Sequence, residues 1–427
     1  MKSVLSRLEK YRVILSNAVS LMGTAVVTSG LGFLYWWIAA RRFSPDAVGF
    51  GSAAISSMLF IGNVSMLGFG TLLIGELPRR SGREGSLIST ALLVVGMTGG
   101  VLGLLFAIAA PEISDNLQEL AENAGTVSLF ALGVSITAVA LVLDQALVGL
   151  LRGDLQLWRN SVFAVVKLFG LFIAGLWLSG KVGFAIYEAW LIGNVASFAA
   201  LLGYVFVKNK RSVSMQPEWG LLRKLGSVAL SHHALNLTLQ TAGLMMPVLV
   251  TTLLSARMNA YFYTAWMISN FATLAPVALT SVLYAVGSAD PAALADKLKF
   301  TLRASMLIGA SISLTLFMSA KLVLSLFASE YAEQASLTLR ILSFAVFPII
   351  IRNHFMTIRR IRGQVAATAL WMLGGTLLEL SLAATGAIVG GLSGLSVGWI
   401  VAISIEALLM ARTLYNVIVP VPSPVPV

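Results

Sequence analysis

The chain has 427 residues, of which 58% are hydrophobic and only 11% are charged, and its mean hydropathy is +0.89. Because a soluble domain carries about a quarter charged residues, this composition excludes an ordinary soluble protein. The absence of cysteine excludes disulfide bonds, thiolate catalysis and cysteine-ligated metals. The net charge of +11 does not indicate nucleic-acid binding, because no basic segment outside the apolar stretches is large enough to form a nucleic-acid-binding domain.

Apolar stretches long enough to cross a bilayer as helices follow one another along the whole chain, which predicts an all-α integral membrane protein. The first stretch is too long for the core of a signal peptide and lacks a cleavage site, so we expect it to be retained as a helix. About twelve spans are predicted, at 13–39, 47–74, 87–110, 126–150, 161–179, 189–207, 228–254, 260–287, 304–326, 336–351, 366–389 and 393–411.

The distribution of Lys and Arg predicts the orientation of these spans. With the N-terminus in the cytoplasm, 22 of the 29 basic residues fall in cytoplasmic segments. The others lie in outer segments (Arg41, Arg42, Lys181, Arg257 and Lys321) or within apolar stretches (Lys167 and Arg340). Because basic residues prefer the cytoplasmic side of short loops, we expect both termini to be cytoplasmic.

The long cytoplasmic segment 208–227 divides the predicted spans into two sets of six. We expect an N-terminal six-helix lobe at 1–207, a linker at 208–227, a C-terminal six-helix lobe at 228–412 and a Pro-rich tail at 413–427. The linker suits either a short helix at the membrane interface or a plain connection. A weak repeat between the two halves predicts pseudo-symmetric lobes around a central cavity, as in transporters built from parallel repeats.

Ionisable residues inside apolar spans are the main functional candidates, because a charge in the membrane must be paired or face water. Asp144 lies eight residues before Arg152, and Lys167 lies eight residues after Arg159. Asp144 and Lys167 are therefore expected at matching depths, about 12 Å from the inner ends of their helices. They are predicted to form a pair. Its role is either that of a structural ion pair or a part in ion coupling or in substrate contact.

Two acidic residues near the C-terminus are further candidates for ion coupling or buried pairing. Glu379 lies nearest the centre of a span and is the best lone candidate for a protonatable group, whereas Glu406 is expected to reach the inner face. Glycines at 386, 390 and 394 have the spacing of closely packed helices. Two aromatic clusters are expected at the outer membrane interface rather than at a sugar-binding site. They are Tyr35, Trp36 and Trp37, and Tyr261, Tyr263 and Trp266.

Two motifs suggest chemistry that the surrounding sequence does not support. Residues 175–182 resemble a phosphate-binding loop, but Val182 stands where Ser or Thr is needed and no strand precedes the loop. His232 and His233 are adjacent on a predicted helix and point about 100° apart, so they do not form one metal-ligand face. We expect no metal, no cofactor and no nucleotide hydrolysis.

Three runs together resemble a known family. They are GLGFLYWWIAARRFSPDAVG at 30–49, LGFGTLLIGELP at 67–78 and LVGLLRGDLQLWRN at 147–160. They are similar to the polysaccharide transport family of bacterial flippases, in the multidrug/oligosaccharidyl-lipid/polysaccharide exporter superfamily. The first run, with its Ser-Pro-x-x-Val-Gly turn, is the most specific.

This resemblance implies a multi-pass protein of the bacterial inner (plasma) membrane. It implies a flippase that moves a polyprenyl-(pyro)phosphate-linked oligosaccharide to the outer leaflet by alternating access, during surface polysaccharide or lipopolysaccharide biosynthesis. Membrane lipids and the polyprenyl-linked glycan would be its partners, with a polysaccharide polymerase or glycosyltransferases of the same pathway. A pyrophosphate requires cations, and the candidates are Lys167, Arg152 and Arg159; for the two arginines the alternative is a role as cytoplasmic anchors.

Two other functions remain open. The first is a cation-coupled multidrug exporter of the same superfamily, although spans one, two, seven, eight and ten contain no Asp or Glu to bind a cationic drug. The second, less favoured, is a membrane enzyme acting on lipid-linked sugars, which would need a larger outer loop or paired acids at an early turn. We expect the protein not to be an enzyme.

Overall fold

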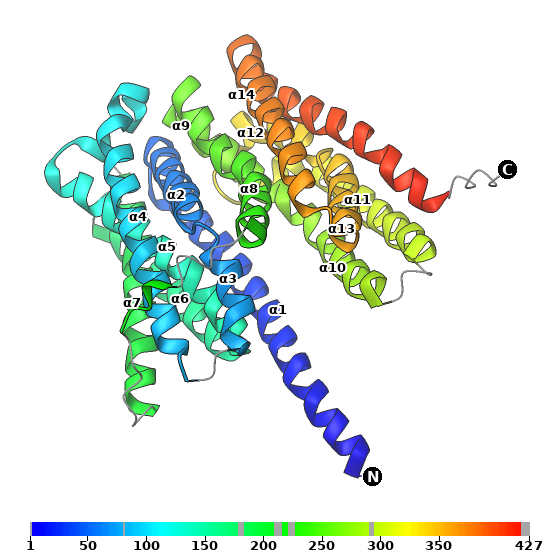
Figure 1. The fold of residues 1–427 in the computed structure, drawn as a ribbon. Helices are drawn as coiled ribbons and strands as arrows, with labels where there is room; N and C mark the ends of the chain where they lie inside the picture. The colour runs from blue at the N-terminus through cyan, green and yellow to red at the C-terminus, as the bar shows by residue number, and fades with distance from the viewer. Residues whose placement is uncertain are drawn as a thin grey trace. The chain divides into compact units, whose positions relative to one another are not determined.

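The computed structural model describes residues 2–79, 82–177, 183–208, 216–220, 227–289 and 294–419. Every regular element among these residues is a helix, which confirms the predicted all-α class (Figure 1). By their internal contacts the helices form two compact units, Met1–Gln240 with Ser255–Ala260, and Thr241–Leu254 with Tyr261–Val427. We call them unit 1 and unit 2, and each is described separately.

Among the described residues, unit 1 contains seven complete α-helices and the beginnings of two more. In it α4 packs along α5, and α1 and α7 both pack on α6. Its helices are α1 (Lys2–Arg42), α2 (Pro45–Ser65), α3 (Phe69–Glu76), α4 (Glu84–Ile113), α5 (Ala124–Gly149), α6 (Gly153–Trp177) and α7 (Phe184–Lys208), with the first parts of α8 (Ser227–Leu253) and α9 (Ala256–Asn270).

Local sequence signals set where these helices begin. Ser44 caps α2, since its Oγ accepts a hydrogen bond from the backbone N–H of Ala47, and Pro45 occupies the first helical position. Asn123 caps α5 in the same way, and Thr126 completes a reciprocal capping box. The turn between the first two predicted spans therefore lies at the Ser-Pro-x-x-Val-Gly motif of the first run.

Unit 2 contains the remaining parts of α8 and α9 and five complete α-helices. Here α11 packs on α10, α12 and α13, and α13 packs on α14. The complete helices are α10 (Leu274–Ala289), α11 (Leu294–Ser325), α12 (Ser329–Ser343), α13 (Val346–Ile361) and α14 (Val365–Ile418). The predicted span at 336–351 is in fact the pair α12 and α13, bent by 42° at the break. Pro348 explains the break, because it lacks an N–H and its ring clashes with the preceding turn.

The described residues account for the predicted number of spans. Ten helices are long and apolar enough to cross a membrane, and the bent pair α12–α13 raises the number to eleven. Helix α14 has 54 residues. At 1.5 Å per residue it would extend about 80 Å, far more than the roughly 30 Å hydrocarbon core. It therefore provides two spans, as the predictions at 366–389 and 393–411 required.

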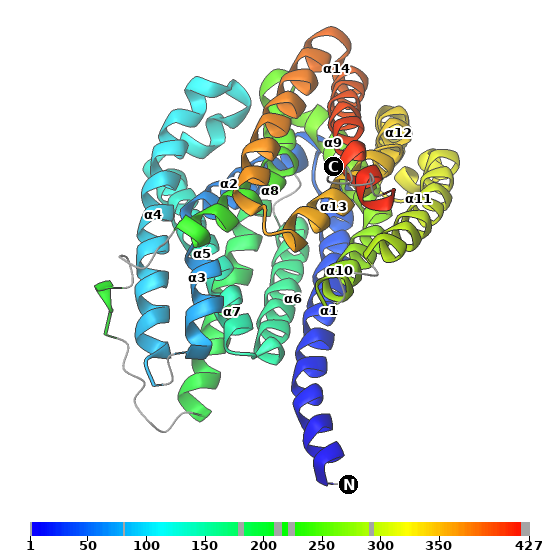
Figure 2. The same ribbon diagram turned by 45° about the vertical axis from the view of Figure 1, so that its right-hand side comes forward.

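A sharp turn at two glycines folds α14 back on itself as a hairpin (Figures 1 and 2). Gly391 has a φ of 57° and a ψ of −141°, a conformation that a side chain disfavours. The two arms then run so close that a Cβ atom added at Gly386 would lie 2.1 Å from the carbonyl oxygen of Gly394, and the reverse contact is equally short. The glycine spacing thus serves close packing, as predicted.

The predicted linker and tail are only partly described. The segment 216–220 lies against α4, where the backbone N–H of Glu218 donates to Thr90 Oγ1 at 2.7 Å. Most of the predicted interfacial helix lies outside the described residues, as do residues 420–427 of the Pro-rich tail. Residues 413–418 continue α14 as helix.

The close approach of the two arms of α14 can be tested by adding one methyl group. We expect Gly394→Ala to lower the free energy of unfolding by roughly 1–3 kcal/mol, because its Cβ would displace a backbone carbonyl. Gly374→Ala is the matched control on the same helix, since no atom lies within 4 Å of its added Cβ. Thermal unfolding of the two purified variants in detergent measures the difference, and equal melting temperatures would contradict the hairpin packing.

Candidate functional site

A buried ion pair joins Asp144 on α5 to Arg159 on α6 in unit 1. Arg159 Nη2 and Nε donate to the two carboxylate oxygens at 2.7 and 3.0 Å. The side chains of Arg159 and Asp144 are only 3% and 18% exposed. Asn160 Nδ2 lies 3.3 Å from both carboxylate oxygens, and Arg159 also reaches Ser197 Oγ on α7 at 3.4 Å. This network fixes three helices to one another through a neutralised pair of charges.

The predicted pairing of Asp144 with Lys167 is therefore wrong. The chain turns between α5 and α6 at residues 150–152, so Asp144 and Arg159 lie at similar distances on either side of that turn. Lys167 lies eight residues beyond Arg159, about 12 Å deeper along α6. The error arose because α6 begins at Gly153 rather than near residue 161.

Arg152 and Arg159, the two arginines proposed with Lys167 to bind a pyrophosphate, occupy different environments. Arg159 is buried in the network, because the early start of α6 places it inside the helix rather than in a loop. Arg152 instead lies at the turn, where its Nε is 3.0 Å from Asp154 Oδ1 and the two side chains are 40% and 60% exposed. Lys167, Arg152 and Arg159 do not form one cluster.

Lys167 is enclosed by aromatic rings. Its Nζ lies 3.6 Å from the ring centroid of Trp190, 4.5 Å from that of Phe163 and 5.1 Å from that of Tyr35. The residue is buried, and within the described part of the chain it forms no hydrogen bond or ion pair. Ring faces attract a cation without neutralising it. Lys167 is therefore a buried amino group that no carboxylate of the described residues neutralises.

The aromatic residues predicted at the outer interface are mostly buried inside the protein. Tyr35 is fully buried and its hydroxyl donates to the carbonyl of Ile186, while Trp36 is also buried. In the second cluster, Tyr261 and Trp266 are buried as well. The interface prediction was wrong for these four residues, because periodicity alone did not show which face of each helix meets another helix.

Unit 2 contains a second buried charged cluster, centred on Glu379. Arg352 Nη1 on α13 donates to Glu379 Oε1 at 2.8 Å, and Trp399 Nε1 on the second arm of α14 donates to Glu379 Oε2 at 2.6 Å. The Glu379 side chain is 1% exposed and that of Arg352 is 15% exposed. Each carboxylate oxygen of Glu379 thus has its own donor.

Glu406, expected at the inner face, is instead buried in the same cluster. The residue is 3% exposed, and neither carboxyl oxygen has a hydrogen-bond partner among the described residues. The charges of Glu379 and Arg352 both act on it. A Cβ added at Gly375 would lie 2.6 Å from Glu406 Cδ, so the carboxyl group packs directly on this glycine. Glu379 is therefore one of two neighbouring carboxyl groups and not a lone site.

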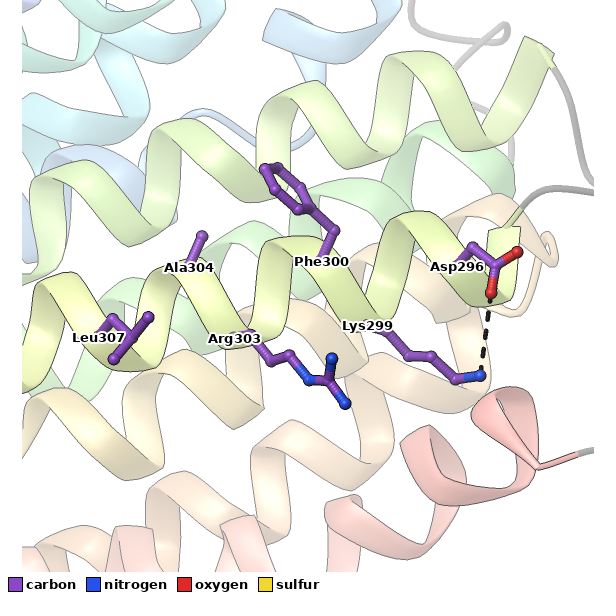
Figure 3. A pocket seen from close by; sticks show the side chains of 6 residues that line it. All are labelled: Asp296, Lys299, Phe300, Arg303, Ala304 and Leu307. Carbon is purple, nitrogen blue, oxygen red and sulfur yellow. Dashed lines mark ion pairs between the residues drawn. The ribbon is translucent and has the colours of Figure 1, made fainter.

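Other features of the described residues do not join these clusters. None of their His, Asp and Glu side chains form a group of three that could hold a metal ion. A surface pocket of about 380 Å³ lies along the start of α11 (Figure 3). Its charged lining residues include Arg303 and Lys299, whose Nζ is 3.8 Å from Asp296 Oδ1. None of the predicted site residues lines this pocket.

The sequence analysis missed several residues that complete these clusters. Trp190 gave no signal, because a tryptophan at the end of an apolar span is usually assigned to the membrane interface. Trp399, inside the predicted span at 393–411, gave no signal either. Gly375 did carry a signal, since it lies four residues before Glu379 and so shares its helix face. Asn160, next to Arg159, lay in a segment interpreted as a loop.

Two ion pairs of unit 1, the buried Asp144–Arg159 and the exposed Arg152–Asp154, provide a matched test of burial. We expect Arg159→Ala to lower the free energy of unfolding by about 3–5 kcal/mol, because it leaves the Asp144 carboxylate buried without a partner. Asp154→Ala, which removes the exposed pair, should change it by at most about 1 kcal/mol. The charge exchange Asp144→Arg with Arg159→Asp should recover part of the loss. Thermal unfolding of the purified variants measures all three, and equal effects of the two alanine variants would argue against a structural network.

Comparison with protein-family models finds no match, and comparison with curated proteins finds none. Solved structures do match. An inward-facing multidrug resistance MATE family transporter of the MOP superfamily is 17% identical over 93% of this chain and 98% of its own, with a TM-score of 0.69. The MATE multidrug transporter DinF-BH, solved as a complex, is 16% identical over 95% and 96%, with a TM-score of 0.65. An outward-facing MATE family transporter is 16% identical over the same shares, with a TM-score of 0.58. The chain therefore has the twelve-helix, two-lobe fold of the MATE transporters.

Proposed function

We propose that this protein exports amphipathic organic molecules across a bacterial plasma membrane by alternating access. The observation that carries the proposal is the fold, which nearly the whole chain shares with transporters solved in both inward-facing and outward-facing conformations. A polar group does not pass through hydrocarbon unaided, because its desolvation is strongly unfavourable. A protein that exposes a binding site to each side in turn avoids that barrier.

The comparisons favour small drug-like substrates, because the similar structures are described as multidrug transporters. They favour this class over the lipid-linked oligosaccharide expected from the sequence runs. Within the described residues, however, Asp144 is paired with Arg159 and Glu379 with Arg352. Glu406 is the carboxyl group of these clusters that has no ion pair or hydrogen-bond partner among the described residues, and it is therefore the candidate contact for a cationic substrate.

A second candidate substrate is a polyprenyl-(pyro)phosphate-linked oligosaccharide, moved to the outer leaflet for surface polysaccharide assembly. Lys167 favours it, because a buried ammonium without a carboxylate partner is suited to an anionic group such as a phosphate. The resemblance of the three sequence runs to polysaccharide flippases also favours it. Its partners would be the polyprenyl-linked glycan and the enzymes of its pathway.

Cells that lack the gene distinguish the two substrate classes. For a multidrug exporter we expect a severalfold loss of tolerance to organic cations such as ethidium, with unchanged lipid-linked oligosaccharide. For a flippase we expect accumulation of polyprenyl-linked oligosaccharide, loss of surface glycan and unchanged tolerance. Mass spectrometry of extracted lipids and growth assays provide the two readouts. If neither changes in the deletion strain, and the purified protein in liposomes moves neither substrate, the export proposal is wrong.

Lys167→Met separates a substrate role from a packing role. Methionine has a similar length and no charge, so we expect the variant to unfold at the same temperature as the parent protein or above it, because a buried cation has been removed. If Lys167 contacts an anionic headgroup, the variant should fail to restore surface glycan in the deletion strain. Leu171→Met, one turn further along α6 and also buried, is the control. Full restoration by Lys167→Met would remove Lys167 from the substrate site.

A further inference from the structure

Unit 2 has a surface pocket that the proposed export function does not use. It is the pocket of about 380 Å³ along the first turns of α11, and its lining shares no residue with the two buried charged clusters (Figure 3). The described residues that line it combine charged and apolar side chains, namely Asp296, Lys299, Phe300, Arg303, Ala304 and Leu307. A pocket of this mixed composition is suited to a ligand that has both a charged and an apolar part.

The charged side chains of the pocket leave one positive charge unbalanced. Lys299 Nζ lies 3.8 Å from Asp296 Oδ1, and these side chains are 41% and 89% exposed. Arg303 is exposed and forms no hydrogen bond or ion pair with any residue that the structure describes. The side chains of Lys299 and Arg303 project from the same side of α11 (Figure 3). The complementary group of a ligand is therefore negatively charged.

The position of Arg303 along α11 places the pocket at the depth of lipid headgroups. No charged residue lies between Arg303 and Lys321 in the sequence. At 1.5 Å per residue the uncharged stretch between them is about 27 Å long, close to the roughly 30 Å hydrocarbon core of a bilayer. Arg303 thus lies at one border of the hydrocarbon core, where the phosphate groups of lipids are found.

The apolar lining of the pocket continues along α11 as an apolar stripe. Phe300 and Leu307 are 69% and 71% exposed, and Leu314 and Met318 are 64% and 73% exposed. At 3.6 residues per turn these four positions fall within about 40° of one another on the helix surface. The stripe therefore runs from headgroup depth into the hydrocarbon core, along the path of an acyl chain. A free phosphate ion would leave Phe300 and Leu307 uncovered.

We propose that this pocket binds an anionic phospholipid. Its phosphodiester accepts hydrogen bonds from Arg303 and Lys299, and one acyl chain lies along the stripe from Phe300 to Met318. Basic pockets on membrane helices attract anionic lipids, because they carry the complementary charge at headgroup depth. Asp296 opposes binding, since its carboxylate repels the headgroup and competes for Lys299. The proposal goes beyond the proposed export function, because it concerns a lipid that stays bound at the surface and not a transported molecule.

Site-specific fluorescence quenching tests the proposal on the full chain. The sequence contains no cysteine, so one introduced cysteine provides a unique labelling site. Ala304→Cys places a bimane fluorophore in the pocket, and Leu370→Cys places it on an exposed position of α14 outside the pocket, as the matched control. The labelled protein is reconstituted into mixtures of phosphatidylglycerol and phosphatidylcholine in which either lipid carries brominated acyl chains. Because bromine quenches on contact, the dependence on composition gives the binding constant of phosphatidylglycerol relative to phosphatidylcholine at the label. Arg303→Gln and Asp296→Asn are then introduced into the Ala304→Cys chain.

We expect phosphatidylglycerol to be favoured about fivefold at the Ala304→Cys label, the factor that one unbalanced basic group contributes near anionic lipid. The two lipids should bind almost equally at the Leu370→Cys label. Arg303→Gln should lower the preference in the pocket about fivefold, and Asp296→Asn should raise it by about the same factor, because each changes the pocket by one charge. Opposite shifts from two neighbouring residues are not expected from a loss of folding.

Equal quenching by the two lipids at the Ala304→Cys label would overturn the proposal, as would a preference of the same size at the Leu370→Cys label. A preference that neither Arg303→Gln nor Asp296→Asn changes would also overturn it, and if one variant does not fold, the other decides. Inorganic phosphate at millimolar concentration separates the two sources of a phosphate group. An unchanged preference supports a lipid, whereas loss of the preference would assign the pocket to a soluble phosphate instead. Since no transport substrate is present, failure here leaves the export proposal untouched.

Discussion

The exclusion of unbalanced charge from the membrane interior is the constraint on which this structure depends. Among the described residues, six charged or chargeable side chains lie deep in the helices of the two clusters: Asp144, Arg159, Lys167, Arg352, Glu379 and Glu406. Ionisable groups in hydrocarbon are rare because their insertion is unfavourable by about 2.5–3.5 kcal/mol each, and they persist where another group compensates them. The two units meet this constraint in different ways.

Unit 1 uses a complete ion pair and an aromatic enclosure. Asp144 and Arg159 neutralise each other and fix α5, α6 and α7 in register through Asn160 and Ser197. Two helical turns further along α6, Lys167 has ring faces around its ammonium instead of a carboxylate. The result is a neutral network and, about 12 Å further along α6, an amino group that has aromatic rings but no carboxylate around it among the described residues, which is the observation behind the proposed anionic substrate.

Unit 2 uses backbone proximity to bring two acids together. The glycine turn in α14 folds the helix into a hairpin, and this places Glu406 of one arm against Gly375 and near Glu379 of the other. Arg352 and Trp399 then satisfy only Glu379. The same close packing that makes the hairpin possible thus creates a buried carboxyl group without a hydrogen-bond partner among the described residues.

Composition and the positions of the apolar stretches determined the class of this protein, the number of its spans and the presence of charges inside them. These properties depend on segment length and hydropathy, which are local. Which charges meet was decided only by the tertiary structure. Counting from Arg152 and from Arg159 predicted similar depths for Asp144 and Lys167, yet the turn at 150–152 aligns Asp144 with Arg159 and leaves Lys167 about 12 Å deeper. Likewise Glu406, 27 residues from Glu379 in the chain, becomes its neighbour only because Gly390 and Gly391 reverse the direction of α14. Helix rotation and turn position are set by packing between segments distant in sequence, and a one-dimensional pattern does not contain them.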